Sequence, residues 1–123
     1  MNKAKAQNIA LWTLQVLGGA LFIMAGFNKL SGNEMMVGMF DAIGFGQWFR
    51  YLTGAIEVVA GILLFIPALS GVGALLLIPT MLGAIGTHLF IIGGSPAVPA
   101  VLLIAMAIVA YGRKERVLSL IKK

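Results

Sequence analysis

Long apolar stretches separated by short polar or glycine-rich segments run through the sequence. Residues 6–28 contain no Asp, Glu, Lys or Arg, and neither do residues 58–112. A helix that crosses a hydrocarbon layer of about 30 Å needs roughly 20 apolar residues. The pattern therefore predicts four membrane-spanning helices, at about residues 9–30, 49–66, 69–92 and 98–112.

Turn-forming residues separate these four segments. Ser-Gly-Asn at residues 31–33, Pro67 and Gly-Gly-Ser-Pro at residues 93–96 each break an apolar helix. Residues 34–45 are largely apolar but too short to span a bilayer, so we expect a short interfacial helix there. The predicted fold class is an all-α membrane protein, a four-helix transmembrane bundle with a short interfacial helix after the first span.

Composition supports a membrane protein and excludes a water-soluble globule. Of 123 residues, 60% are hydrophobic and 11% are charged, against roughly 25% charged residues in soluble domains. The net charge is +5, but the basic residues lie mainly near the two ends of the chain and form no stripe that would follow a nucleic acid. We therefore expect the lipid bilayer as partner, and no nucleic acid.

The basic residues also predict the orientation of the chain in the membrane. Lys3 and Lys5 precede the first span, residues 113–123 carry five more, and the second and third connections carry none. Basic flanks face the cytoplasm, so both termini should be cytoplasmic and residues 113–123 should form a basic cytoplasmic tail. A secretory signal peptide is the less favoured interpretation of the N-terminus, because the apolar run exceeds the length of an h-region.

Three ionisable side chains fall inside or at the edge of the predicted spans. They are Lys29, Glu57 and His88, and the predicted topology places all three in the outer half of the bundle. An ionisable group in a bilayer is costly, so each needs a partner or a function. We expect an intramembrane polar cluster that binds a ligand, to which Asn28 and Thr53 supply further hydrogen bonds.

Structural explanations of the same residues remain open. Lys29 could extend to the headgroups, a Lys29–Glu57 pair could serve only to hold two helices together, and His88 could be a hydrogen-bonded structural residue. Small residues in membrane helices usually mark close helix contacts. This explanation applies to five glycines, namely Gly18, Gly19, Gly26, Gly83 and Gly86.

The residue inventory narrows the chemistry. With no cysteine, the chain cannot supply a thiol, a thiolate metal site or an iron–sulfur cluster. One histidine without a second imidazole makes a poor zinc or copper site, so we predict no metal. No catalytic motif is recognised, which favours a non-catalytic protein, although an enzyme with Glu57 or His88 as acid or base remains the least favoured alternative.

Three short motifs resemble the DoxX-like family of small four-helix membrane proteins. They are Gly-Phe-Asn-Lys-Leu at residues 26–30, Gly-Ala-Ile-Glu at 54–57 followed by Gly61, and Met-Leu-Gly-Ala at 81–84 followed by His88. The resemblance implies a bundle in the bacterial cytoplasmic membrane. It also implies an association with membrane oxidoreductases, because the family includes a small subunit associated with thiosulfate:quinone oxidoreductase. It brings no catalytic role for Lys29, Glu57 or His88.

The leading hypothesis is a non-catalytic subunit or a small-lipophile-binding component of a membrane redox system. A quinone-like molecule is the candidate ligand, a membrane oxidoreductase is the candidate partner, and no other cofactor is expected. The alternative is a small proton-coupled transporter or exporter in which Glu57 titrates. Because four helices enclose little volume, transport would require a homo-oligomer.

Overall fold

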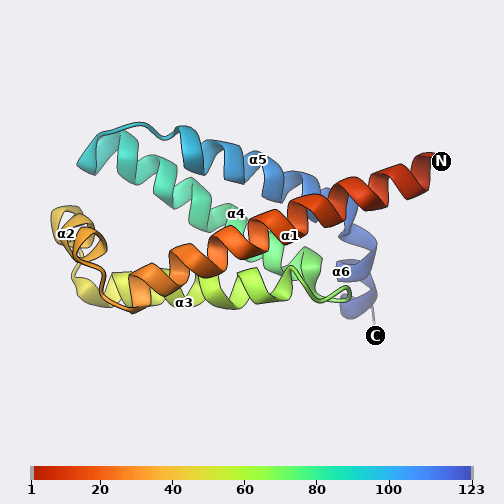
Figure 1. The fold of residues 1–123 in the computed structure, drawn as a ribbon, viewed down its shortest axis with the longest axis horizontal. Coiled ribbons are helices and arrows are strands. Elements are labelled where there is room, and N and C mark those ends of the chain that lie inside the picture. The colour runs from red at the N-terminus through yellow and green to blue at the C-terminus, as the bar shows by residue number, and fades with distance from the viewer. Residues whose placement is uncertain (1, 123) are drawn as a thin grey trace.

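The computed structural model describes residues 2–122, which form helices and no strands. In chain order the elements are α1 (Lys3–Leu30), α2 (Glu34–Ile43), α3 (Gln47–Leu63), α4 (Ser70–Thr87), the π-helix η1 (His88–Ile92), α5 (Ala97–Gly112) and α6 (Lys114–Ile121). Figure 1 shows α1, α3, α4 and α5 as the long helices of a bundle. Both chain termini lie at one end, the terminal end, and α2 lies at the other, the α2 end. The predicted all-α fold class is confirmed.

Two helical segments are each long and apolar enough to cross a membrane: α1, and the continuous run of α4 and η1 from Ser70 to Ile92. The helices α5 and α6 form a third such segment if the pair, bent by 58°, counts as one. Helix α3 has 17 residues and ends before the predicted boundary, because residues 64–69 form turns around Pro67. The count of four spans stays a prediction.

Side-chain caps and glycines fix the ends of the first two helices. The Asn2 side chain accepts a hydrogen bond from the Lys5 amide at 2.8 Å, so α1 starts well before the predicted residue 9. Asn33 caps α2 in the same way through the Met35 amide, at 2.9 Å. Gly44, with φ of +89°, ends α2 in the left-handed conformation that glycine adopts without strain. The predicted short helix after the first span is thus present.

Helices α1 and α3 approach each other through two facing pairs of glycines. A Cβ atom on Gly26 would lie 2.6 Å from the Gly54 carbonyl oxygen, and one on Gly61 would lie 3.0 Å from the Gly19 carbonyl oxygen. Contacts this short leave no room for a side chain, and they allow the two backbones to pack directly. The predicted packing role of Gly19 and Gly26 is confirmed.

Helices α3 and α4 touch at the terminal end and diverge toward the α2 end (Figure 1). A Cβ on Gly73 would lie 2.7 Å from the Ala60 carbonyl oxygen. The buried core lies in the same region, and it consists of Phe22, Ala60, Leu64, Ala74, Leu77, Met81, Met106 and Val109. Further along α4, a Cβ on Gly83 or Gly86 would meet no atom within 4 Å. Within this chain neither glycine is a packing position, contrary to the prediction, because no atom of another helix lies against it.

Candidate functional site

A buried ion pair joins the C-terminal turn of α1 to the middle of α3. The Nζ of Lys29 lies 2.6 Å from Oε1 of Glu57, and only 3% of Glu57 is exposed. The glycine contact one turn away brings the two helices close enough for this pair, since a Cβ on Gly54 would lie 3.0 Å from the Lys29 Cβ. The structure therefore brings together two of the predicted site residues, from segments far apart in the sequence.

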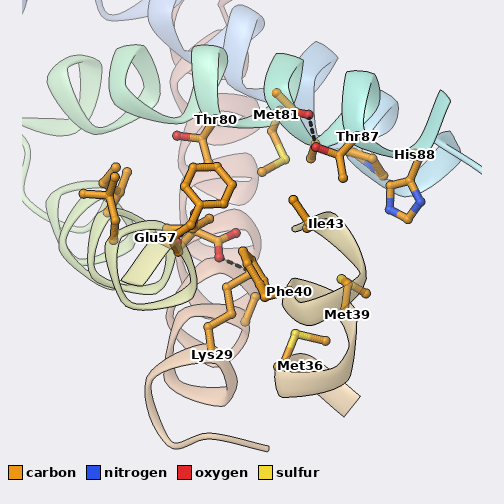
Figure 2. A pocket seen from close by; sticks show the side chains of 18 of the residues that line it. Lys29, Met36, Met39, Phe40, Ile43, Glu57, Thr80, Met81, Thr87 and His88 are labelled. Carbon is orange, nitrogen blue, oxygen red and sulfur yellow. Dashed lines mark hydrogen bonds and ion pairs between the residues drawn. The ribbon is translucent and has the colours of Figure 1, made fainter. Parts of the chain in front are cut away.

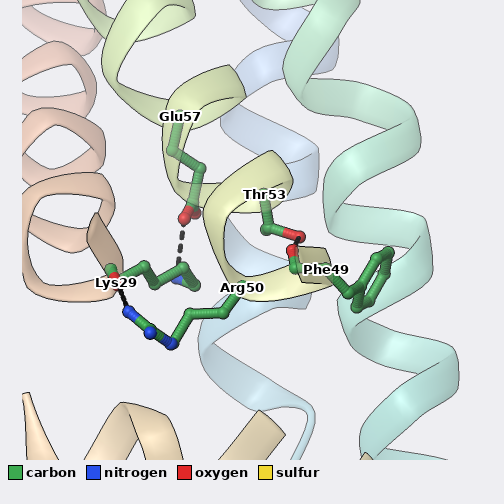
Figure 3. A network of polar contacts seen from close by, with 5 residues as sticks. All are labelled: Lys29, Phe49, Arg50, Thr53 and Glu57. Carbon is green, nitrogen blue, oxygen red and sulfur yellow. Dashed lines mark hydrogen bonds and ion pairs between the residues drawn. The ribbon is translucent and has the colours of Figure 1, made fainter. Parts of the chain in front are cut away.

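Arg50 holds the backbone beside this ion pair, and the sequence analysis did not single it out. Its Nη1 donates to the Lys29 carbonyl oxygen (Figure 3), and its Nε donates to Gln47 Oε1 at 2.6 Å. The carbonyl groups of a last helical turn lack partners within the helix, so the guanidinium caps α1. The Arg50 side chain also lies over the Tyr51 ring, 4.4 Å from its centroid. An arginine next to an aromatic residue at a helix start was the available signal.

A cavity of about 580 Å³ opens beside the ion pair. Its wall is formed mostly by apolar side chains from α2, α3, α4 and the start of α5. Figure 2 shows Met36, Met39, Phe40 and Ile43 of α2 facing Lys29 and Glu57 across it. The polar side chains of the lining are Lys29, Thr53, Glu57, Thr80, Thr87 and His88. A large, mostly apolar cavity with a few polar groups in its wall is typical of a small-molecule site.

His88 lines the same cavity but lies away from the ion pair. Figure 2 shows His88 and Glu57 on opposite sides of the cavity. The Nδ1 of His88 lies 3.0 Å from the Gly93 carbonyl oxygen, and a carbonyl only accepts, so Nδ1 carries the proton. In the neutral ring Nε2 is then left as an acceptor. The structure therefore places His88 in the cavity lining but does not bring it into contact with the ion pair, as a single polar cluster would require.

The two remaining predicted site residues differ in their positions. Thr53 lines the cavity, with its hydroxyl donated to the Phe49 carbonyl oxygen at 2.8 Å, so its oxygen can only accept from a ligand. Asn28 is exposed, and it is absent from the cavity lining. Residues 2–122 contain no group of three or more His, Asp or Glu side chains placed to hold a metal ion.

A second polar network, which was not predicted from the sequence, lies at the terminal end. Gln15 is fully buried, donates to the Leu64 carbonyl oxygen at 2.9 Å and accepts from Arg113 Nε at 2.7 Å. Arg113 also donates to Asn8 Oδ1 at 3.0 Å. Burial, and to a smaller extent Arg116, lowers the pKa of Arg113 from its ordinary value, but a guanidinium remains charged at neutral pH. A lone glutamine in an apolar span was the available signal.

The apolar helices and the buried site define a helical membrane protein. The sequence model of the DoxX-like family matches residues 13–111, which is most of the chain, so the protein belongs to this family. The resemblance carried by the three short motifs is thereby confirmed.

A curated relative supports the family assignment. It is a protein of Bacillus subtilis (strain 168) named "Putative oxidoreductase CatD", and it is 31% identical over 83 residues, which are 68% of this chain and 62% of the relative. The aligned part therefore spans less than two thirds of that relative. No solved structure matches the chain.

Proposed function

We propose that this protein binds a small lipophilic molecule of the quinone type, and that it does so as a non-catalytic component of a membrane redox system. The observation that carries the proposal is the cavity of about 580 Å³ with the Lys29–Glu57 pair in its wall. Ligand pockets typically enclose roughly 300–1,000 Å³. The volume therefore suits a ring-sized head group with part of its chain.

The polar groups of the cavity suit a molecule with carbonyl or hydroxyl groups. The ammonium of Lys29 has three N–H donors, of which one is directed to Glu57, so a ligand carbonyl can accept another. The Nε2 of His88, on the opposite side, can accept from a hydroxyl or donate when the ring is protonated. Two polar anchors with apolar walls between them would orient a molecule that has oxygen atoms at both ends of a ring.

The redox context rests on the relative and on the residue inventory. The relative carries the name "Putative oxidoreductase CatD", and this chain has no cysteine with which to build a thiol or iron–sulfur centre. In the proposed arrangement a membrane oxidoreductase supplies the electrons, and this protein holds the lipophile near it.

Purification with native lipids, followed by mass analysis of the bound molecules, tests the proposal. We expect a co-purifying lipophile at a fixed ratio to the protein. Ala84 lines the cavity, so Ala84→Phe should place a ring in the cavity and expel that molecule. The matched control is Ala107→Phe, at an exposed position of α5 outside the cavity, which should retain it.

Two results would count against the proposal. One is a wild-type protein that carries no lipophile, or a lipophile equally abundant in both phenylalanine variants. The other result concerns the redox context. A gentle pull-down of this protein from membranes would enrich no oxidoreductase beyond the amount found with an unrelated membrane protein.

A further inference from the structure

The cavity is not closed on the side between α3 and α4. Four of its lining residues are exposed on that side, Leu52 on α3 and Leu76, Pro79 and Gly83 on α4. All four are apolar, and the two helices that carry them diverge toward the α2 end (Figure 1). We call these four residues the rim. At the α2 end, by contrast, side chains of α2 cover the cavity (Figure 2).

The rim lies in the middle of a helix that is able to span a membrane. The run from Ser70 to Ile92 has 23 residues, and Gly83 lies thirteen residues beyond Ser70, about 20 Å along the axis. In a bilayer of about 30 Å this position falls inside the hydrocarbon layer. The opening therefore faces lipid chains rather than water.

Gly83 leaves free space in the rim. A Cβ there would meet no atom within 4 Å, so the glycine is not required by packing. Gly86, three residues further along α4, is equally free but does not line the cavity. The two glycines thus differ in whether they line the cavity, and so in whether a side chain would narrow the opening.

The charge of the cavity constrains the head group of a ligand. The ammonium of Lys29 and the carboxylate of Glu57 neutralise each other at 2.6 Å, so their sum is zero. A charged head group beside them would remain uncompensated in a region of low dielectric, which is costly. An uncharged carbonyl or hydroxyl group would instead hydrogen-bond to the pair.

We propose that an uncharged, single-chain amphiphile of the bilayer enters this cavity laterally between α3 and α4, past Gly83. Its head group rests at the Lys29–Glu57 pair, and its hydrocarbon chain extends through the rim into the lipid. This inference rests on the proposed function, and adds to it the route and the ligand class.

The test compares Gly83→Leu with Gly86→Leu in lipid nanodiscs. The probes are a decyl-substituted para-benzoquinone and its methyl-substituted analogue, and equilibrium binding is measured for both. Gly83→Leu should weaken binding of the decyl probe about tenfold, or about 1.4 kcal/mol, and that of the methyl probe by less than about twofold. Gly86→Leu should leave both affinities unchanged, because Gly86 does not line the cavity.

The possible outcomes separate the route from the function. The lateral route would be overturned if the wild type and Gly83→Leu bound the decyl probe equally well. It would also be overturned if both leucine variants lost the same affinity, or if Gly83→Leu lost the same affinity for both probes. Each of these results would leave the proposed function standing. A wild type that binds neither probe would remove both proposals. If Gly83→Leu does not fold, Gly83→Ala provides a smaller obstruction. Its affinity for the decyl probe should be lower than that of the wild type, by less than the roughly tenfold loss expected for Gly83→Leu.

A third probe tests the ligand class. A decyl-trimethylammonium ion has the same chain and a permanently charged head, and we expect it to bind the wild type at least about tenfold more weakly than the decyl-benzoquinone. Equal affinities would show that the cavity does not select uncharged head groups.

Discussion

The two ends of the bundle use polar residues in opposite ways. At the terminal end the polar residues Gln15 and Arg113 bind each other and a backbone carbonyl, within closely packed helices. At the α2 end Lys29 and Glu57 bind each other in the wall of a cavity. In the first network the Gln15 amide uses both its donor and its acceptor within the protein, whereas in the second the Lys29 ammonium has further N–H donors beyond the one directed to Glu57.

Glycines show a second difference, which is between pairs of helices rather than between the two ends. Gly26 of α1 lies against the Gly54 carbonyl oxygen, whereas Gly86 of α4 faces empty space. A glycine is thus required by close packing at the first position and not at the second. The difference indicates that the contact between α1 and α3 provides stability, and that the separation of α3 and α4 leaves room for a ligand. Each prediction below tests one side of this division.

The largest effect is expected at the ion pair. Glu57→Met leaves the ammonium of Lys29 without its carboxylate, and breaking a buried pair by removing one partner costs about 3–5 kcal/mol. The cost should fall toward the lower value because the Lys29 side chain is 15% exposed. Equilibrium unfolding in mixed micelles with increasing dodecyl sulfate measures the change in free energy.

The double variant Lys29→Met/Glu57→Met separates stability from binding. Replacing both charges by apolar side chains is often neutral or stabilising, so most of the lost stability should return, whereas affinity for the decyl-benzoquinone should not. Recovery of both properties would mean that the pair has no role in binding. Recovery of neither would mean that the pair has a structural role which methionine cannot replace.

The next largest effect is expected at the contact between α1 and α3. Gly26→Ala places a Cβ atom 2.6 Å from the Gly54 carbonyl oxygen, and the helices must separate to admit it. Overpacking of this kind costs about 1–3 kcal/mol. The cost should lie near the upper value because the neighbouring atom belongs to the backbone and cannot rotate away as a side chain can. The same unfolding measurement checks this. An unchanged free energy of unfolding would contradict the direct backbone contact.

A smaller effect is expected at the terminal end. Gln15→Leu removes the donor to the Leu64 carbonyl and the acceptor for Arg113, and leaving such buried groups unpaired costs roughly 1–2 kcal/mol. Affinity for the decyl-benzoquinone should not change, because Gln15 lies outside the cavity lining. A loss of affinity comparable to that of Glu57→Met would show that the two ends are not independent.

The sequence predicted the helices, and it indicated that Glu57 needs a partner, because both follow from local rules. Apolar length defines the helices, and the cost of burying a charge in the bilayer requires Glu57 to have a partner. Lys29 was the nearest candidate, since it lies at about the same predicted depth on the adjacent span. The glycine contact at Gly26 followed from the same expectation that small residues lie between helices.

The sequence could not predict which glycines face a neighbouring helix. Gly83 and Gly26 have similar local surroundings in the sequence, and their difference arises from the divergence of α3 and α4, which is a property of the tertiary structure. The role of Arg50 was missed for a related reason. Its partner is a backbone carbonyl on another helix, and no residue type marks a carbonyl as available.

The smallest effect is expected at Gly86, and it should have the opposite sign to that at Gly26. Alanine has a higher helix propensity than glycine by about 0.5–1 kcal/mol, and a Cβ atom on Gly86 meets nothing within 4 Å. Gly86→Ala should therefore stabilise the protein slightly in the same unfolding measurement, whereas Gly26→Ala destabilises it. Destabilisation of both variants by similar amounts would mean that another copy of the chain, or a partner protein, packs against α4 at Gly86.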